Sequence, residues 1–145
     1  AMQSLSEEDF SHLLADLIEN AFIAMSDVTD KKILINLGRM GNHLSVEISD
    51  NGQPFSPEIF QDFGLKAHTT HAGNGGSGIG LMDIWKLKKK YRASLVITEY
   101  VPGTYSYTKQ ISLIFDAKKH YIIQTYRRRE LGQIRFRDDL YIFPC

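Results

Sequence analysis

Residues 75–81 read GGSGIGL and run directly into MDIW at 82–85. The alternating glycines Gly76, Gly78 and Gly80 leave three positions without a Cβ, so the chain can turn sharply there and a ligand can touch its backbone. The apolar residues that follow recur at the spacing of a helix: Leu81, Ile84, Trp85 and Leu87. We therefore expect a helix N-terminus at the glycines, where free amide groups and the helix dipole favour a phosphate. A flexible loop is the alternative interpretation.

The spacing of these glycines excludes two common phosphate-binding loops. A Walker loop needs a lysine after its second glycine, but Leu81 follows Gly80. The dinucleotide fingerprint needs a glycine three residues after Gly78, and that position is again Leu81. A phosphate bound here therefore lacks the usual lysine. We expect another part of the chain to supply charge compensation, through a metal ion.

The composition fits a single globular domain over residues 1–145. The formal net charge is zero, which argues against binding of nucleic acid or an anionic membrane by the whole surface. The sequence has no apolar run of about 18 residues, so we expect no transmembrane helix. Cys145 is the only cysteine, which excludes an internal disulfide and fits a reducing compartment.

A helix is predicted to begin after Ser6, because this hydroxyl is followed by Asp9 in the arrangement of a capping box. Asp16 and Asn20 lie one helical turn apart on its polar face, beside Glu19. Their oxygens suit Mg²⁺, which proteins usually hold through one or two side chains together with water and phosphate. A solvated helix face is the alternative. The opposite, apolar stripe has a period of 3.6 residues and comprises Leu13, Leu14, Leu17, Ile18, Ala21, Phe22 and Met25.

Two strands, 32–40 and 43–50, are predicted on either side of a Gly-Asn hairpin turn at 41–42. The second strand ends at Asp50, in the sequence DNGQP. One interpretation is a plain turn, because Asp, Asn and Gly are common turn residues. In the other, Asp50 accepts a hydrogen bond from the amino group of a nucleobase, and Gly52 leaves room for the flat ring.

A short helix is predicted to start at residues 56–58, with Pro57 at its first position. A polar segment bounded by glycine and asparagine follows at 64–74. A metal site on the two histidines of this segment lacks matching ligands elsewhere in the chain. We therefore interpret the segment as a lid that closes over phosphates. Its polar residues are Lys66, His68, Thr69, Thr70 and His71.

The remaining chain predicts strands over 94–100, 107–115, 121–126 and 133–143. The lysines at 86–90 are interpreted as a solvated helix face near the negative end of the helix dipole. Beyond residue 115, Lys and Arg outnumber Asp and Glu. We interpret this tail as extra edge strands that finish the sheet, with a docking surface as the alternative.

The order of these features resembles that of a known family. DLIENA at 16–21, DNG at 50–52 and GSGIGL at 76–81 are similar to the N, G1 and G2 boxes of the GHKL ATP-binding superfamily. Within it, the chain looks most like the catalytic and ATP-binding domain of bacterial sensor histidine kinases. The resemblance implies an α/β two-layer sandwich (the Bergerat fold), with helices on one face of a mixed, mostly antiparallel sheet. The core would cover about residues 6–115, and 116–145 would form a C-terminal β extension.

The resemblance also implies roles for individual residues. Asn20 corresponds to the Mg²⁺ ligand, Asp50 to the carboxylate that reads the adenine amino group, and Gly52 to the glycine beneath the ring. A threonine is expected near the adenine carboxylate, and we choose Thr108, with Thr104 as the alternative. The lid hinge and the phosphate-facing turn correspond to Gly76, Gly78, Gly80 and Leu81.

Two positions depart from the family pattern. Asp16 stands where histidine kinases usually carry asparagine and the superfamily's ATPases carry a glutamate base. It is therefore expected either to activate water or to help bind Mg²⁺. Ile23 stands where many kinases carry a lysine or another polar residue. Phosphate contacts are therefore expected from the lid, at Lys66, Thr69, Thr70 or His71.

The resemblance implies a kinase module that binds ATP and Mg²⁺ and passes the γ-phosphoryl group to a histidine on a dimerisation domain, and from there to a response regulator. None of the five histidines lies in a segment of the phosphoacceptor type. We therefore expect a cytoplasmic catalytic fragment, with the phosphoacceptor, the homodimer contact and a membrane anchor in absent segments. Two alternatives stay open: a nucleotide-binding regulatory module without phosphotransfer, and an ATPase that uses Asp16 as base.

Overall fold

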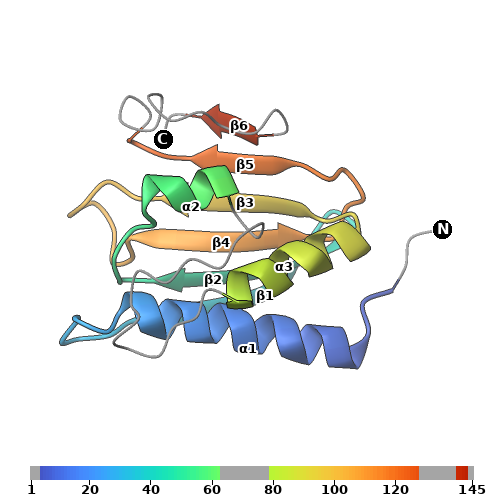
Figure 1. Cartoon of the computed structure of the whole chain (residues 1–145), viewed down its shortest axis with the longest axis horizontal. Helices are drawn as coiled ribbons and strands as arrows, with labels where there is room; N and C mark the ends of the chain where they lie inside the picture. The colour runs from blue at the N-terminus through green and yellow to red at the C-terminus, as the bar shows by residue number, and fades with distance from the viewer. Residues whose placement is uncertain (1–3, 63–78, 128–139, 144–145) are drawn as a thin grey trace.

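The computed structural model describes residues 4–62, 79–127 and 140–143. This part of the chain forms three helices and six strands, which Figure 1 shows as two layers, with the helices on one face of the sheet. In chain order they are α1 (Glu7–Ala24), β1 (Ile33–Met40), β2 (His43–Asp50), α2 (Pro57–Asp62), α3 (Ile79–Lys90), β3 (Ser94–Glu99), β4 (Lys109–Ile114), β5 (Tyr121–Gln124) and β6 (Leu140–Phe143).

The strands form one sheet in the order β1-β2-β4-β3-β5-β6. The pairs from β1 to β3 are antiparallel, and β5 and β6 then add to β3 in parallel. The predicted α/β sandwich with a mixed, mostly antiparallel sheet is therefore confirmed, as are the extra C-terminal strands. Of the strand predicted over 133–143, only Leu140–Phe143 lies within the described residues.

Strand register brings the inward-facing side chains into straight rows across the sheet, because alternate residues of a strand face the same side. One row joins Ile48, Ile111, Ile97 and Ile123, each opposite the next. All four are buried against the helices. The row nearest the end of β2 is charged instead, and it begins at Asp50. The apolar core thus ends where the predicted base-binding residue lies.

Helix α1 packs its apolar stripe against α3 and strand β2. Leu13, Leu17 and Ala21 are fully buried, as the apolar stripe predicted. The prediction is wrong for Phe22, which is 49% exposed. This residue lies on the outer edge of the stripe, where no described element covers it. A short hydrogen bond of 2.5 Å from Tyr91 Oη to Asp9 Oδ2 ties the start of α1 to the end of α3.

Ser6→Ala is expected to lower the free energy of unfolding by about 1 kcal/mol. The Ser6 hydroxyl accepts a hydrogen bond from the Asp9 amide at 3.1 Å and so satisfies one free donor of the helix end. Urea denaturation measures the loss. Ser4→Ala is the control, since Ser4 is exposed and caps no helix. Equal stability of the two variants would contradict the capping role.

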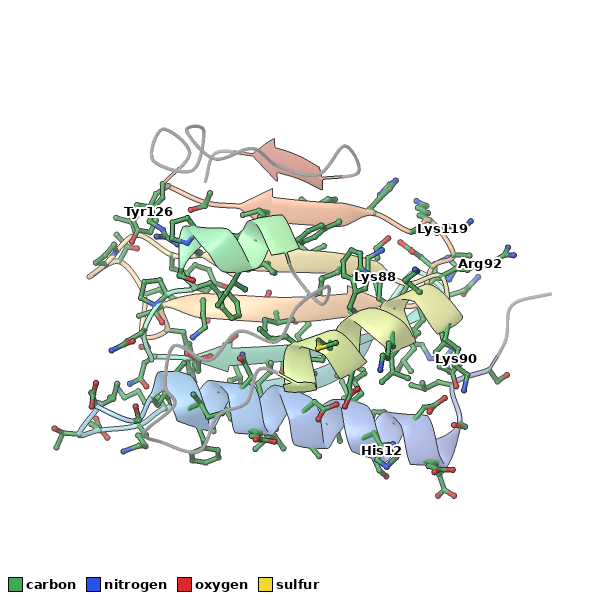
Figure 2. All side chains as sticks on the ribbon, in the orientation of Figure 1. His12, Lys88, Lys90, Arg92, Lys119 and Tyr126 are labelled. Carbon is green, nitrogen blue, oxygen red and sulfur yellow. The ribbon has the colours of Figure 1, made fainter. Side chains whose placement is uncertain are left out.

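The lysines of α3 differ in part from the prediction. Lys88 is buried: its Nζ donates to the Lys119 carbonyl at 3.1 Å and lies 4.9 Å from the centroid of the Trp85 ring. Lys88 therefore packs on the core, whereas Lys89 remains exposed as predicted. Figure 2 shows Lys88, Arg92 and Lys119 together at the C-terminal end of α3, opposite the end that follows the glycines.

Candidate functional site

Asp50 ends β2 and is almost fully buried, with 2% of its surface exposed. Its Oδ1 accepts two hydrogen bonds, from the Gly52 amide at 2.8 Å and from Lys109 Nζ at 2.7 Å. No described residue donates a hydrogen bond to its other oxygen, Oδ2. The carboxylate is therefore held through one oxygen, and the second is left for a donor.

Gly52 is the point at which the turn after β2 meets the end of α1. An ideal Cβ on this residue would lie 2.4 Å from both the carbonyl carbon and the oxygen of Ala24. The adjacent Gln53 amide donates to the Ala24 carbonyl at 2.8 Å. The backbone of α1 thus fills the space that a side chain would need. Glycine is required here by helix contact, a reason that the sequence pattern did not reveal.

Thr108 lies directly beside this turn. Its hydroxyl donates to the Gly52 carbonyl at 2.7 Å, and its amide donates to the Asp50 carbonyl at 2.9 Å. Thr104, the alternative, lies in the β3–β4 connection, where its hydroxyl donates to the Val101 carbonyl at 2.6 Å. The structure therefore places Thr108, and not Thr104, next to Asp50.

Asp16 and Asn20 lie half-buried on α1, two turns and one turn, respectively, before Ala24, which contacts Gly52. Asn20 Nδ2 is buried and has no hydrogen-bond partner within the part of the chain that the structure describes. Such a donor costs free energy unless an acceptor meets it, which points to a ligand on this side of α1. One carboxylate and one amide oxygen are also a donor set that suits Mg²⁺. Among the described residues, no group of three or more His, Cys, Asp or Glu side chains forms a metal site.

Helix α3 approaches the same face of α1. Burial raises the pKa of Asp16 to about 6, and the negative charges of Asp83 on α3 and of Glu19 add to this rise. His12, labelled on α1 in Figure 2, lowers the pKa of Asp16 and so acts in the opposite direction. A third acidic side chain, Asp83, therefore faces the predicted metal-binding residues from α3, and sequence spacing alone gave no sign of it.

The glycine stretch lies only partly within the described residues. Helix α3 begins at Ile79, so Gly80 and Leu81 form its first turn. The Leu81 side chain is buried in the core, so only its backbone is available to a ligand. Ile23, where a polar residue was expected, is half-buried on α1. The predicted residues Lys66, Thr69, Thr70, His71, Gly76 and Gly78 lie outside the described residues.

The sequence profile of the family described as histidine kinase-, DNA gyrase B- and HSP90-like ATPase matches residues 6–118. The chain belongs to this ATPase family. It is 30% identical over 84 residues to the sensor protein CitS of Halalkalibacterium halodurans. This match covers 56% of this chain and 16% of CitS. Its fold is similar to that of the mycobacterial sensor histidine kinase MprB, with a TM-score of 0.60 at 15% identity over 76% of this chain and 71% of the other.

The predicted GHKL relationship is thereby confirmed, and the chain is a histidine kinase-like ATPase domain. Membership of this ATPase family implies that the domain binds ATP. The chain spans about one sixth of CitS, since the match covers 16% of that protein. Within the described residues, no helix has both the length and the hydropathy to cross a bilayer.

Sequence reasoning missed Lys109, the cation that pairs with Asp50 in this ATPase domain. A signal was present: the period of two in KQISLI places Lys109 on the same face as Ile111 and Leu113. Both are core residues, so a lysine in line with them must be buried and paired. Lys109 is fully buried, and its partner is Asp50.

Asp16→Asn is expected to stabilise the domain at neutral pH. The folded domain binds the Asp16 proton more tightly than the unfolded chain, because the pKa is raised from 3.8 to about 6. Stability is therefore lost as pH rises through this window, and asparagine abolishes that loss. Thermal unfolding in EDTA without nucleotide should give the variant a higher Tm at neutral pH, with the difference shrinking as pH falls through about 6 and vanishing below the unfolded pKa of 3.8. A Tm difference that is independent of pH would contradict this assignment.

Proposed function

We propose that this chain is the catalytic domain of a two-component sensor histidine kinase, which binds ATP with Mg²⁺ and transfers the γ-phosphoryl group to a histidine on a dimerisation domain. One observation carries the proposal. The Asp50 turn, the unpartnered Asn20 amide and the first turn of α3 lie on the helix-covered side of one sheet. We assign them to the base, the metal and the phosphates in turn. The names of CitS and MprB, a sensor protein and a sensor histidine kinase, support it.

At the base end, Asp50 Oδ2 accepts a hydrogen bond from the adenine amino group, while Thr108 and Gly52 hold the turn. At the other end, the dipole and free amides of the first turn of α3, with Gly80 and Leu81, receive phosphate oxygens. Bound Mg²⁺ would neutralise phosphate charge, and Asn20 Oδ1 and Asp16 would hold it. Lys66, Thr70, Gly76 and Gly78 would complete the phosphate side.

Phosphoryl transfer of this kind depends on positioning and charge neutralisation more than on covalent help from the protein. The dimerisation domain of the same protein would present the phosphoacceptor histidine, and a response regulator would then receive the phosphoryl group. The full-length protein would be a homodimer whose catalytic domain is cytoplasmic and whose other segments provide the membrane anchor. No contact of this domain with nucleic acid is proposed.

Incubation of the domain with radiolabelled ATP, Mg²⁺ and the dimerisation segment of the full-length protein tests the proposal. We expect label on a histidine of that segment, recognised by its loss in acid and its stability in base. ATP binding without transfer would instead support a nucleotide-binding regulatory module.

A second candidate, ATP hydrolysis, rests on Asp16. Its pKa of about 6 is close to neutral pH, as a general base requires. In that case Asp16→Asn would abolish hydrolysis, whereas a kinase would retain histidine phosphorylation in the same variant. Phosphate release and histidine labelling, measured side by side on Asp16→Asn, separate the two reactions.

A further inference from the structure

Three buried charges and the half-buried Arg127 form a row across the helix-covered face of the sheet, beginning at Asp50. Register places Asp50 opposite Lys109, and Lys109 opposite Glu99 on β3. Lys109 Nζ lies 2.7 Å from Asp50 Oδ1. Arg127, after β5, completes the row: its Nε lies 3.0 Å from Glu99 Oε1 and its Nη2 lies 2.7 Å from Oε2. The signs alternate from carboxylate to ammonium, carboxylate and guanidinium.

Burial makes the members of this row depend on one another. The exposed fractions of the side chains are 3% for Asp50, 1% for Lys109, 1% for Glu99 and 11% for Arg127. Burial lowers the pKa of Lys109, and the neighbouring carboxylates of Asp50 and Glu99 oppose this shift. A buried charge persists only when an opposite charge and hydrogen bonds compensate it. Removal of one member therefore leaves its neighbours uncompensated.

The two cations also fix the backbone that follows Asp50. Lys109 Nζ donates to the Gln53 carbonyl at 2.8 Å, and Arg127 Nη2 donates to the Phe55 carbonyl at 2.8 Å. Lys109 Nζ also lies 5.4 Å from the centroid of the Phe55 ring. The turn that carries the base-reading carboxylate is thus held from the adjacent strand β4 and from the segment after β5, three strands away from β2. Figure 2 labels Tyr126, the residue before Arg127, at the end of β5 on the side where the chain enters α2.

We propose that Lys109 and Arg127 are positioning residues for the Asp50 carboxylate, and that the segment after β5 is thereby part of the base-binding end of the site. This inference rests on the function proposed above. Lys109 and the Gly52 amide occupy Oδ1, which reserves Oδ2 for the amino group of the base. Arg127 holds Glu99, which lies opposite Lys109 on β3 and attracts its ammonium group. Arg127 lies beyond residue 118, where the family match ends, so this support belongs to the C-terminal extension.

The test compares ATP with inosine triphosphate, which carries a carbonyl oxygen in place of the amino group. Calorimetry with Mg²⁺ on the 145-residue chain gives both Kd values. The wild type should prefer ATP. Arg127→Met should weaken ATP binding by about tenfold, as expected for a disturbed charge-assisted hydrogen bond, with inosine triphosphate binding almost unchanged. Arg127→Lys retains the positive charge and should recover part of the preference.

Ser94→Ala is the matched control, because Ser94 fastens the same C-terminal segment at the other end of β3. Its hydroxyl donates to Asp116 Oδ1 at 2.9 Å and accepts from the His120 amide at 3.1 Å. This variant should lose stability and keep the wild-type preference for ATP. An unchanged ATP preference in Arg127→Met, or an equal loss for both nucleotides, would overturn the positioning role. A wild type that binds neither nucleotide would overturn the proposed function as well.

Discussion

Gly52→Ala is expected to destabilise the domain by about 3 kcal/mol or more, at the upper end of the range for overpacked buried positions. The new Cβ would lie 2.4 Å from two backbone atoms of Ala24 and 2.8 Å from its Cβ. Neither the end of α1 nor the turn after β2 can move freely. The Gln53 amide binds the Ala24 carbonyl, and Thr108 binds the Gly52 carbonyl. The clash must therefore be relieved by breaking one of these contacts.

Chemical denaturation with circular dichroism measures this loss of stability. Gly38→Ala provides the control, because the nearest atom to its added Cβ is Ser45 Oγ at 3.7 Å, an ordinary contact. That variant should stay within about 0.5 kcal/mol of the wild type. If Gly52→Ala were equally well tolerated, the close approach of α1 to the turn would not exist in solution.

Asn20→Ala is expected to reduce phosphoryl transfer by a factor of about 10²–10³, the usual effect of losing one electrostatic contact to a transition state. The Asn20 amide combines an oxygen suited to Mg²⁺ with a buried Nδ2 donor that lacks a partner. Removal of an unsatisfied buried group should not destabilise the fold. The variant should therefore keep its Tm while transfer is lost, as measured by histidine labelling with a saturating concentration of ATP.

Glu19→Ala is the control for this experiment, because Glu19 is the preceding residue of α1 and is exposed. It should retain transfer close to the wild-type rate. Full activity of Asn20→Ala would remove Asn20 from the metal site and leave the unpartnered amide without a functional explanation.

Local sequence patterns were sufficient to predict most of the elements. The hairpin signal at 41–42 predicted both β1 and β2, and the capping hydroxyl of Ser6 predicted the start of α1. Strand ends were less accurate, since β4 begins at Lys109 rather than at residue 107. Thr108 lies at this boundary: its amide donates to the carbonyl of Asp50, the last residue of β2, and its hydroxyl donates to the Gly52 carbonyl in the turn that follows. Such a contact depends on a residue far away in the sequence.

The site was predictable where neighbouring residues define it and not where strand register does. The sequence DNG placed Asp50 at a strand end, where the structure has it. No local pattern relates Asp50 to Lys109 or Glu99, because these residues become neighbours only through pairing of β2, β4 and β3. The helix contact of Gly52 was missed for the same reason, since Ala24 lies on a different element.

The central claim is that Asp50 reads the base of a bound nucleotide, and calorimetric titration of ATP into wild type and Asp50→Asn tests it most directly. Asp9→Asn is the matched control, because Asp9 is another lysine-paired carboxylate, 2.7 Å from Lys90, in the first turn of α1, whereas the Asp50 turn contacts the other end of that helix at Ala24. We predict binding by the wild type and Asp9→Asn, and binding weakened by about tenfold or more in Asp50→Asn. Equal ATP affinity in Asp50→Asn and the wild type, with both folded, would contradict the claim.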